Sequence, residues 1–173
     1  MSEATGNFGL AGAPSLAQRV VDFLRMLGCA VAPPVVRVAL ALPFLRSGLT
    51  RWDAPFSLSA GTTFLFEEQF RLHVLGNAWP FPFPDQVAYL VASAEIVFPC
   101  LLLLGLATRL SGFALLCMTA VIQLVFPDGW VKFHLYWAAL ALSVMALGPG
   151  RLSVDALLWD GLMRARSTAH KGV

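Results

Sequence analysis

The sequence predicts an all-α integral membrane protein built as a bundle of four membrane-spanning helices. Apolar residues make up 58% of the chain and charged residues only 13%, against about 45–50% and 25% in soluble domains. Four apolar stretches, at about 33–49, 86–104, 111–126 and 131–147, come close to the roughly 20 residues that a helix needs to cross a bilayer. With a mean hydropathy of +0.72, the chain is expected to have the lipid bilayer as its first partner.

Charge and cysteine content exclude several other classes of protein. The net charge is only +2, and no basic patch carries interleaved aromatic residues, so nucleic acid is not an expected partner. The cysteines Cys29, Cys100 and Cys117 lie far apart without a C-x-x-C pair, which argues against a disulfide framework or a dithiol relay. Motifs for phosphate binding, zinc proteolysis and nucleophilic hydrolysis are absent from the sequence. Catalytic residues are therefore unknown, no metal ligand set is expected, and catalysis by the chain alone is the less favoured interpretation.

Residues 1–30 are expected to form a polar tail and a short amphipathic helix, before the spanning domain at 31–150. Ser15 and Gln18 have the spacing of a capping box, and Gly28 offers a stop after residues 15–27. Such a short helix, with charges opposite an apolar face, is typical of a segment that lies on the membrane surface. A short soluble amphipathic helix explains the pattern equally well.

The first span, about 33–49, contains three prolines and two arginines. Pro33 and Pro34 suit a helix start, whereas Pro43 is expected to kink the helix. Arg37 is expected to extend its charge to the nearest membrane surface. Arg46 could also extend to its nearest surface, but it follows the kink and precedes Ser47 and Gly48, which favours a position inside the bundle.

Residues 50–84 form the long connection of the chain, and connections of this length are often functional. Trp52 is expected to lie at the membrane–water interface, where tryptophan is enriched. Phe66, Phe70 and Val74 fall on one face of a predicted short helix. The PFPFP segment at 80–84 is then expected to run extended into the second span.

The remaining spans are separated by short turns. Asp85 is expected to cap the second span, PDGW at 127–130 to form the turn after the third, and residues 148–150 to end the fourth. Residues 151–173 are expected to hold an amphipathic helix, capped by Ser153 and running through Trp159 and Met163, and a polar tail.

Lysines and arginines beside the spans predict the orientation. Seven lie on one side and three on the other, an asymmetry that places the richer side in the cytoplasm. The first group is Arg19, Arg25, Arg109, Arg151, Arg164, Arg166 and Lys171, and the second is Arg51, Arg71 and Lys132. We therefore expect both termini to be cytoplasmic and the 51–84 loop to be outside.

Several ordered motifs resemble the DoxX family of small bacterial membrane proteins. They are LPFLRSGLTRWD, FLFEEQFRL, AEIVFP, LLLLGLATR, H-x-x-W at 134–137 and GPGRLSVD, and the resemblance covers about residues 35–158. It implies a four-helix membrane bundle in the bacterial inner (plasma) membrane. It also implies a link to redox, thiol, oxidative-stress or metal-stress systems, since a DoxD-like branch is associated with a thiosulfate:quinone oxidoreductase.

Polar residues from all four spans are expected to meet in the outer half of the bundle, and these residues are Arg46, Glu95, Gln123 and His134. A carboxylate at membrane depth is costly and needs a partner, so we expect Glu95 to pair with Arg46. A histidine beside this pair could carry protons or bind a polar ligand head. A purely structural lock, in which Arg46 neutralises Glu95 and the other two groups satisfy the backbone, accounts for the same residues.

Two further sets of residues are candidates by position. Trp52, Phe66, Phe70 and Trp137 are interfacial or loop candidates, and Arg109 with Asp155 is expected to form a structural pair on the cytoplasmic side.

Three functions remain open from the sequence. The first is a non-catalytic or quinone-interacting membrane subunit of a redox, thiol or metal-stress system, with quinone as the candidate cofactor. The family resemblance adds an alternative, the membrane subunit of a thiosulfate:quinone oxidoreductase-type enzyme. The second is a scaffold that docks a partner protein through the 51–84 loop, and a homodimer is a further candidate assembly. The third, a small transporter, has little support because four spans make a narrow bundle.

Overall fold

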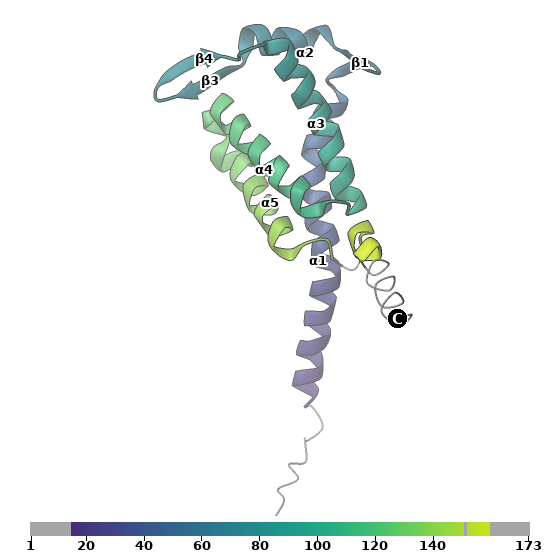
Figure 1. The fold of residues 1–173 in the computed structure, drawn as a ribbon. Coiled ribbons are helices and arrows are strands. Elements are labelled where there is room, and N and C mark those ends of the chain that lie inside the picture. The colour runs from purple at the N-terminus through teal and green to yellow at the C-terminus, as the bar shows by residue number, and fades with distance from the viewer. Residues whose placement is uncertain (1–14, 151, 160–173) are drawn as a thin grey trace, which may run out of the picture.

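The computed structural model describes residues 15–150 and 152–159. Its long helices are α1 (Leu16–Leu49), α3 (Pro84–Leu104), α4 (Thr108–Val125) and α5 (Leu135–Leu147), and a layer of short elements covers one end of them (Figure 1). Within these residues, four helical segments are long and apolar enough to cross a membrane, namely α1, α3, α4 and the stretch Pro127–Leu147 that includes α5. The prediction of an all-α membrane bundle with four candidate spans is therefore confirmed.

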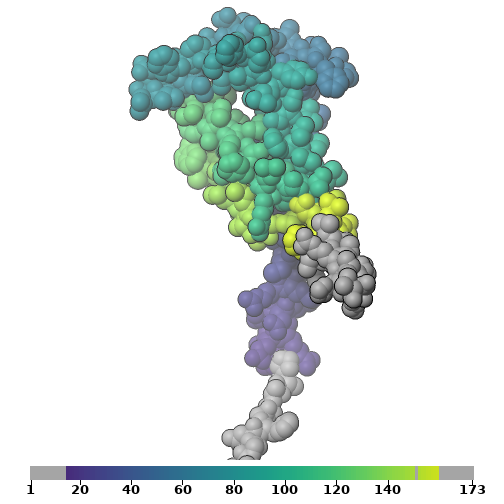
Figure 2. All heavy atoms as spheres, in the orientation of Figure 1, coloured from purple at the N-terminus to yellow at the C-terminus, as the bar shows by residue number. Residues whose placement is uncertain are grey.

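Helix α1 is one continuous element, so the expectation of a separate surface helix that stops at Gly28 is wrong. The Ser15 capping box is present, with the Gln18 N–H donating to Ser15 Oγ at 3.3 Å and the Ser15 N–H to Gln18 Oε1 at 2.8 Å. Glycine costs only about 1 kcal/mol in a helix interior, which is too little to end a helix without turn-forming residues beside it. At ~1.5 Å per residue, the 34 residues of α1 exceed the ~30 Å hydrocarbon core. Residues 16–31 are all exposed and project beyond the bundle (Figures 1 and 2).

The 51–83 segment forms the layer at what we call the loop end. Strands β1 (Trp52–Ala54) and β2 (Ser57–Leu58) pair antiparallel, and helix α2 (Ala60–Phe64) continues into a π-helical turn at Leu65–Gln69. Strands β3 (Arg71–Val74) and β4 (Asn77–Pro80) then form a hairpin.

The predicted helix in this layer is thus only half right, because its second half is strand β3. Phe70 leaves the helical region with φ −77° and ψ 124°. Leu75 and Gly76 both have positive φ, 52° and 81°, as a two-residue hairpin turn of type I′ requires. The hairpin lies against α4, where His73 Nδ1 is 3.2 Å from the carbonyl oxygen of Leu124.

Helix α3 begins differently from the prediction. Its N-cap is Phe83, in the left-handed region at φ 50°, and Pro84 occupies the first helical position. Asp85 lies in the first turn and makes no capping hydrogen bond, so its carboxylate interacts with the helix dipole instead. The proline at position 84 moves the helix start two residues upstream, because it suits the first position of a helix.

The opposite end of the bundle, which we call the turn end, is where α3 stops at Leu104 and α4 starts at Thr108 around Gly105. Ser153 caps the last described helix, 154–159, by accepting the Ala156 N–H at 3.1 Å, as predicted. Met163, the predicted end of that helix, lies outside the described residues.

Small and branched apolar side chains from the four long helices fill the core, with α1 against α3 and α4 against α5. The buried set is Leu40, Ala41, Phe44, Leu102, Leu115, Ala141 and Val144. Gly48 brings the backbone of α1 against α3, because an added Cβ there would lie 2.9 Å from the carbonyl carbon, the oxygen and the Cβ of Glu95. Close backbone approach at small residues is typical of helix packing in membranes.

This contact predicts opposite results for two glycines of α1. Gly48→Ala should lower the free energy of unfolding by about 1–3 kcal/mol, since α1 and α3 must move apart. Gly28→Ala is the matched control: an added Cβ there meets no atom within 4 Å, so it should be neutral or stabilise by up to ~1 kcal/mol. Unfolding in mixed detergent micelles measures both, and equal effects would contradict the assigned contact.

Candidate functional site

A cavity of about 1040 Å³ lies between α1, α3, α4 and α5 under the loop-end layer. The helices α3 and α4 are joined at the turn end and lean apart toward the loop end (Figure 1), which leaves space between them. Its walls are mainly apolar and aromatic, with Phe66, Phe70, Phe81, Phe98, Phe133 and Trp137 among the lining residues. Phe66 contacts both Phe70 and Phe81, at centroid distances of 5.0 and 5.8 Å. The loop-end layer therefore serves as an aromatic roof for the cavity.

An ion pair between Arg51 and Glu95 forms the first polar group in this cavity. Glu95 is 2% exposed and the Arg51 side chain 15%. Arg51 Nε donates to Glu95 Oε2, and Arg51 Nη2 donates to Oε1 at 3.0 Å, so the contact is bidentate. Bidentate guanidinium–carboxylate pairs are among the stronger hydrogen-bonded contacts in proteins. The guanidinium also lies 5.5 Å from the centroid of the Phe66 ring, a cation–π distance that ties the roof to the pair.

The expected partner of Glu95, Arg46, does not form this pair. Arg46 is exposed, and the structure brings Arg51 to the carboxylate instead. At ~100° per residue, Arg46 lies almost opposite the bundle-facing Gly48 on α1. Arg51 follows the end of the helix, where the chain can turn back over α3. Treating position 51 as part of the connecting loop concealed this partner.

His134 and Gln123 form the second polar group, and the structure brings them together as expected. His134 is 4% exposed, and its Nδ1 lies 2.6 Å from Gln123 Oε1. Gln123 Nε2 in turn donates to the carbonyl oxygen of Pro127 at 2.9 Å. His134 lines the cavity beside Trp137, at a ring distance of 5.5 Å, whereas Gln123 lies behind it. Glu95 and His134 thus share one cavity, with Gln123 as support.

The four interfacial or loop candidates have different surroundings. Phe66 and Phe70 belong to the roof, and Trp137 is part of the cavity wall, with its ring 5.3 Å from Phe44. Trp52 lies in β1 and packs edge-on against Tyr89 at 5.2 Å.

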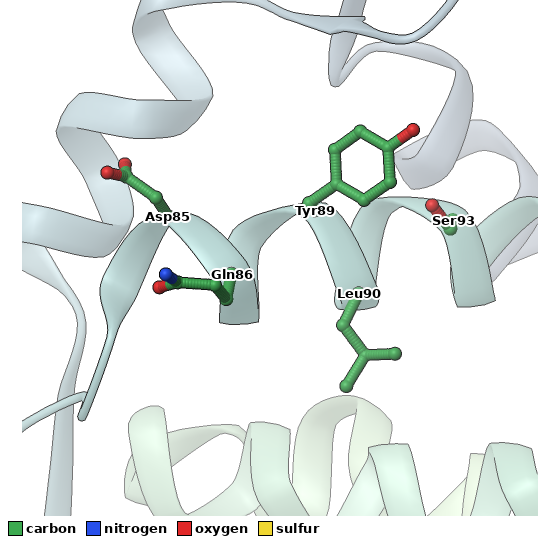
Figure 3. Close-up of a pocket in the computed structure, with 5 residues that line it drawn as sticks. All are labelled: Asp85, Gln86, Tyr89, Leu90 and Ser93. Carbon is green, nitrogen blue, oxygen red and sulfur yellow. The ribbon is translucent and has the colours of Figure 1, made fainter.

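A smaller recess of about 530 Å³ lies on the surface of α3. Figure 3 shows its lining residues, Asp85, Gln86, Tyr89, Leu90 and Ser93. None of these five side chains is buried, and the recess holds no ion pair among the described residues. We therefore regard the aromatic-roofed cavity as the candidate site.

The turn end is closed by Asp155, although not in the predicted way. The expected pair with Arg109 is not formed, and Arg109 is exposed. Asp155 instead accepts the backbone N–H groups of Ala107 and Thr108 at 2.8 and 2.9 Å and the Thr108 hydroxyl at 2.9 Å. Burial alone would raise the pKa of Asp155, but these hydrogen bonds and the charge of Arg37 outweigh it and hold that pKa below its usual value.

Arg37 also departs from its prediction, because it is buried rather than extended to the surface. Its Nη2 donates to the carbonyl oxygen of Leu152 at 2.6 Å, and an added Cβ on Gly105 would collide with its Nη1. Arg37 and Asp155 therefore fasten the segment 152–159 to α1 and to the α3–α4 turn.

These features define the class: a multi-pass helical membrane protein with a large apolar cavity that contains two polar groups. The sequence matches the DoxX family over residues 32–128. This match covers more than half of the chain, which therefore belongs to the DoxX family. It is also 29% identical over 144 residues to a protein of Haemophilus influenzae described as uncharacterized, covering 76% of this chain and 86% of that one. No solved structure matches the chain.

The ion pair predicts a specific pattern of rescue. Glu95→Gln should leave Arg51 without its counter-charge and cost up to about 3–5 kcal/mol of unfolding free energy, toward the low end because Arg51 retains some exposure. Adding Arg51→Met should restore most of the loss, since both charges are then removed.

Arg46→Met is the matched control for this rescue, and in the Glu95→Gln background it should restore nothing. Denaturation of the single and double variants in mixed micelles measures these effects. Rescue by Arg46→Met rather than by Arg51→Met would overturn the assigned pairing.

Proposed function

We propose that this protein is a membrane subunit of a redox, thiol or metal-stress system, not catalytic on its own, which binds a lipid-soluble ring compound of the quinone class. The observation that carries the proposal is the cavity of about 1040 Å³ with the Arg51–Glu95 pair and His134 in its walls. Small-molecule sites are typically cavities of ~300–1,000 Å³, mostly apolar, with a few polar groups that fix orientation. Family membership supports the membrane location of this activity.

The chemistry of the cavity suits this ligand class. Aromatic walls at Phe66, Phe70 and Trp137 favour a flat ring. The guanidinium of Arg51 supplies hydrogen-bond donors and His134 supplies an imidazole, so opposite polar substituents of a ring have partners within one cavity. A single apolar pocket without charge would not distinguish such a compound from a lipid tail.

We propose further that the chain resides in a bacterial inner membrane with both termini in the cytoplasm and the loop end outside. The excess of lysine and arginine beside the turn end and the termini supports this orientation. The cavity would then lie in the outer half of the membrane.

A second candidate function is the docking of a partner protein or a second copy on the loop-end layer. The observation that favours it is the exposure of apolar side chains there: Leu75 is 96% exposed, Phe56 84% and Phe83 74%. Large exposed apolar groups in one layer are typical of interaction surfaces. The two functions are compatible, because a docked partner would cover the roof of the cavity.

Ligand binding by the cavity is tested with a decyl-substituted benzoquinone added to purified protein in detergent. Ala94 lines the cavity, so Ala94→Phe should fill it and weaken binding at least about tenfold, a loss of ~1.4 kcal/mol. Ser93→Phe is the control, since Ser93 belongs to the surface recess of Figure 3 and should leave binding unchanged. Extracts of the wild-type protein, analysed by mass spectrometry, should contain a co-purified ring compound.

Equal binding by both variants would place the ligand elsewhere. An absence of binding by the wild-type protein, together with ligand-free extracts, would refute the proposed function.

Orientation is tested by cysteine labelling in a background that lacks the three native cysteines. Ser57→Cys, exposed in β2, should react with a membrane-impermeant maleimide in intact spheroplasts, whereas Ser167→Cys should react only after lysis. The reverse pattern would invert the topology and place the cavity in the cytoplasmic half of the membrane.

A further inference from the structure

The hydrogen bonds around Gln123 determine which nitrogen of His134 carries a proton. The carbonyl oxygen of Pro127 can only accept, so the amide atom of Gln123 that lies 2.9 Å from it must be the donor Nε2. The other amide atom, Oε1, therefore faces His134 Nδ1 at 2.6 Å and can only accept. Nδ1 must then carry the hydrogen, as network reasoning of this kind assigns tautomers. In a neutral imidazole of this tautomer, Nε2 is a hydrogen-bond acceptor.

This acceptor is open to the cavity. Nε2 makes no hydrogen bond within the described residues. The fully buried side-chain atoms without a hydrogen-bond partner in those residues belong to Arg37, Trp52 and Ser111, so the unpaired Nε2 of His134 retains some accessible surface. Gly129 packs against the face of the imidazole, where an added Cβ would come within 3.0 Å of Cε1, Nε2 and Nδ1. A side chain at position 129 would therefore displace the ring, so glycine is needed for His134 to keep this position.

We propose that His134 Nε2 accepts a hydrogen bond from a ring hydroxyl, so that the cavity selects phenols and hydroquinones over rings without a hydroxyl donor. This inference rests on one part of the proposed function, namely that the ligand binds in this cavity. Gln123 is a positioning residue, which fixes the tautomer through the Pro127 carbonyl. The hydroxyl-bearing, reduced form of a quinone-class compound is then the form that this wall recognises.

Three side chains with oxygen acceptors also line the cavity and must be distinguished from His134, namely Ser47, Glu95 and Asp128. Both oxygens of Glu95 and the Ser47 hydroxyl already accept hydrogen bonds from Arg51. The Asp128 carboxylate accepts no hydrogen bond among the described residues, but it is exposed. The imidazole is buried in the wall, held between Gln123 and Trp137.

The test compares 4-heptylphenol with 1-fluoro-4-heptylbenzene, which has nearly the same size but no donor. At pH 8, well above the usual histidine pKa of about 6.5, the wild-type protein should bind the phenol about fivefold to tenfold more tightly, as one hydrogen bond allows. His134→Phe should abolish the preference while keeping affinity for the fluoro compound. Gly129→Ala should also reduce it, by displacing the imidazole, and Asp128→Asn should leave it unchanged.

Each outcome has a defined meaning. Equal affinities for the two probes in the wild-type protein would overturn the role of His134 and leave the proposed function intact. A preference that survives His134→Phe would also overturn it, and the loss of that preference in Asp128→Asn would assign the acceptor to Asp128. If neither these probes nor the decyl-benzoquinone binds, the proposed function and this inference fail together.

The tautomer can be measured without altering the cavity. ¹⁵N NMR of histidine-labelled protein, in which His73 and His170 are replaced by Gln, should show Nδ1 protonated and Nε2 unprotonated at pH 8. In Gln123→Met the other tautomer should appear, because the fixed acceptor for Nδ1 has gone. A dominant Nε2–H tautomer in the protein that retains Gln123 would refute the inference.

Discussion

The burial of the Glu95 carboxylate is the constraint on which the loop end of this protein depends. A charge removed from water needs a counter-charge and saturated hydrogen bonds, and the chain supplies both by turning back over α3 directly after α1, so that Arg51 meets Glu95 from outside the helix. Gly48 permits this close approach of α1 to α3. The guanidinium then anchors Phe66, and with it the aromatic roof. A single acidic residue therefore links the packing of two helices to the placement of the layer that covers the cavity.

The two ends of the bundle solve the problem of buried polar groups differently. At the turn end, the carboxylate of Asp155 accepts three hydrogen bonds from the start of α4, and Arg37 donates to the backbone of the following segment. These contacts hold α1, α3 and α4 together. At the loop end, α3 and α4 lie farther apart (Figure 1), and the polar groups face a cavity. Because the helices are held together at the turn end, α3 and α4 can diverge at the loop end without breaking those contacts.

Sequence reasoning predicted the spans well, because continuous apolar runs report directly on burial in lipid. It also found Glu95, Gln123 and His134, since polar residues within such runs are rare and need partners. It predicted the wrong ion-pair partner for Glu95, because that partner depends on the direction of the chain after the end of α1. Arg51 was assigned to the connecting loop, and Arg46 was expected to pair with Glu95. It also missed β3, because Leu72 and Val74 fit either a helical or an alternating pattern until the Leu75–Gly76 turn is recognised. The role of Arg37 depends on a contact with a residue 115 positions away, and that of Asp155 on contacts with residues 47 and 48 positions away at the start of α4.

The length of α1 has a mechanical consequence. Its exposed part, residues 16–31, belongs to the same helix as Gly48, which touches the backbone of Glu95. Pro33, Pro34 and Pro43 lie between these two points, and each removes one backbone hydrogen-bond donor, yet the helix continues through all three. A displacement of the exposed part is therefore transmitted along α1 itself to the ion pair and the cavity wall, with any bending concentrated at the prolines.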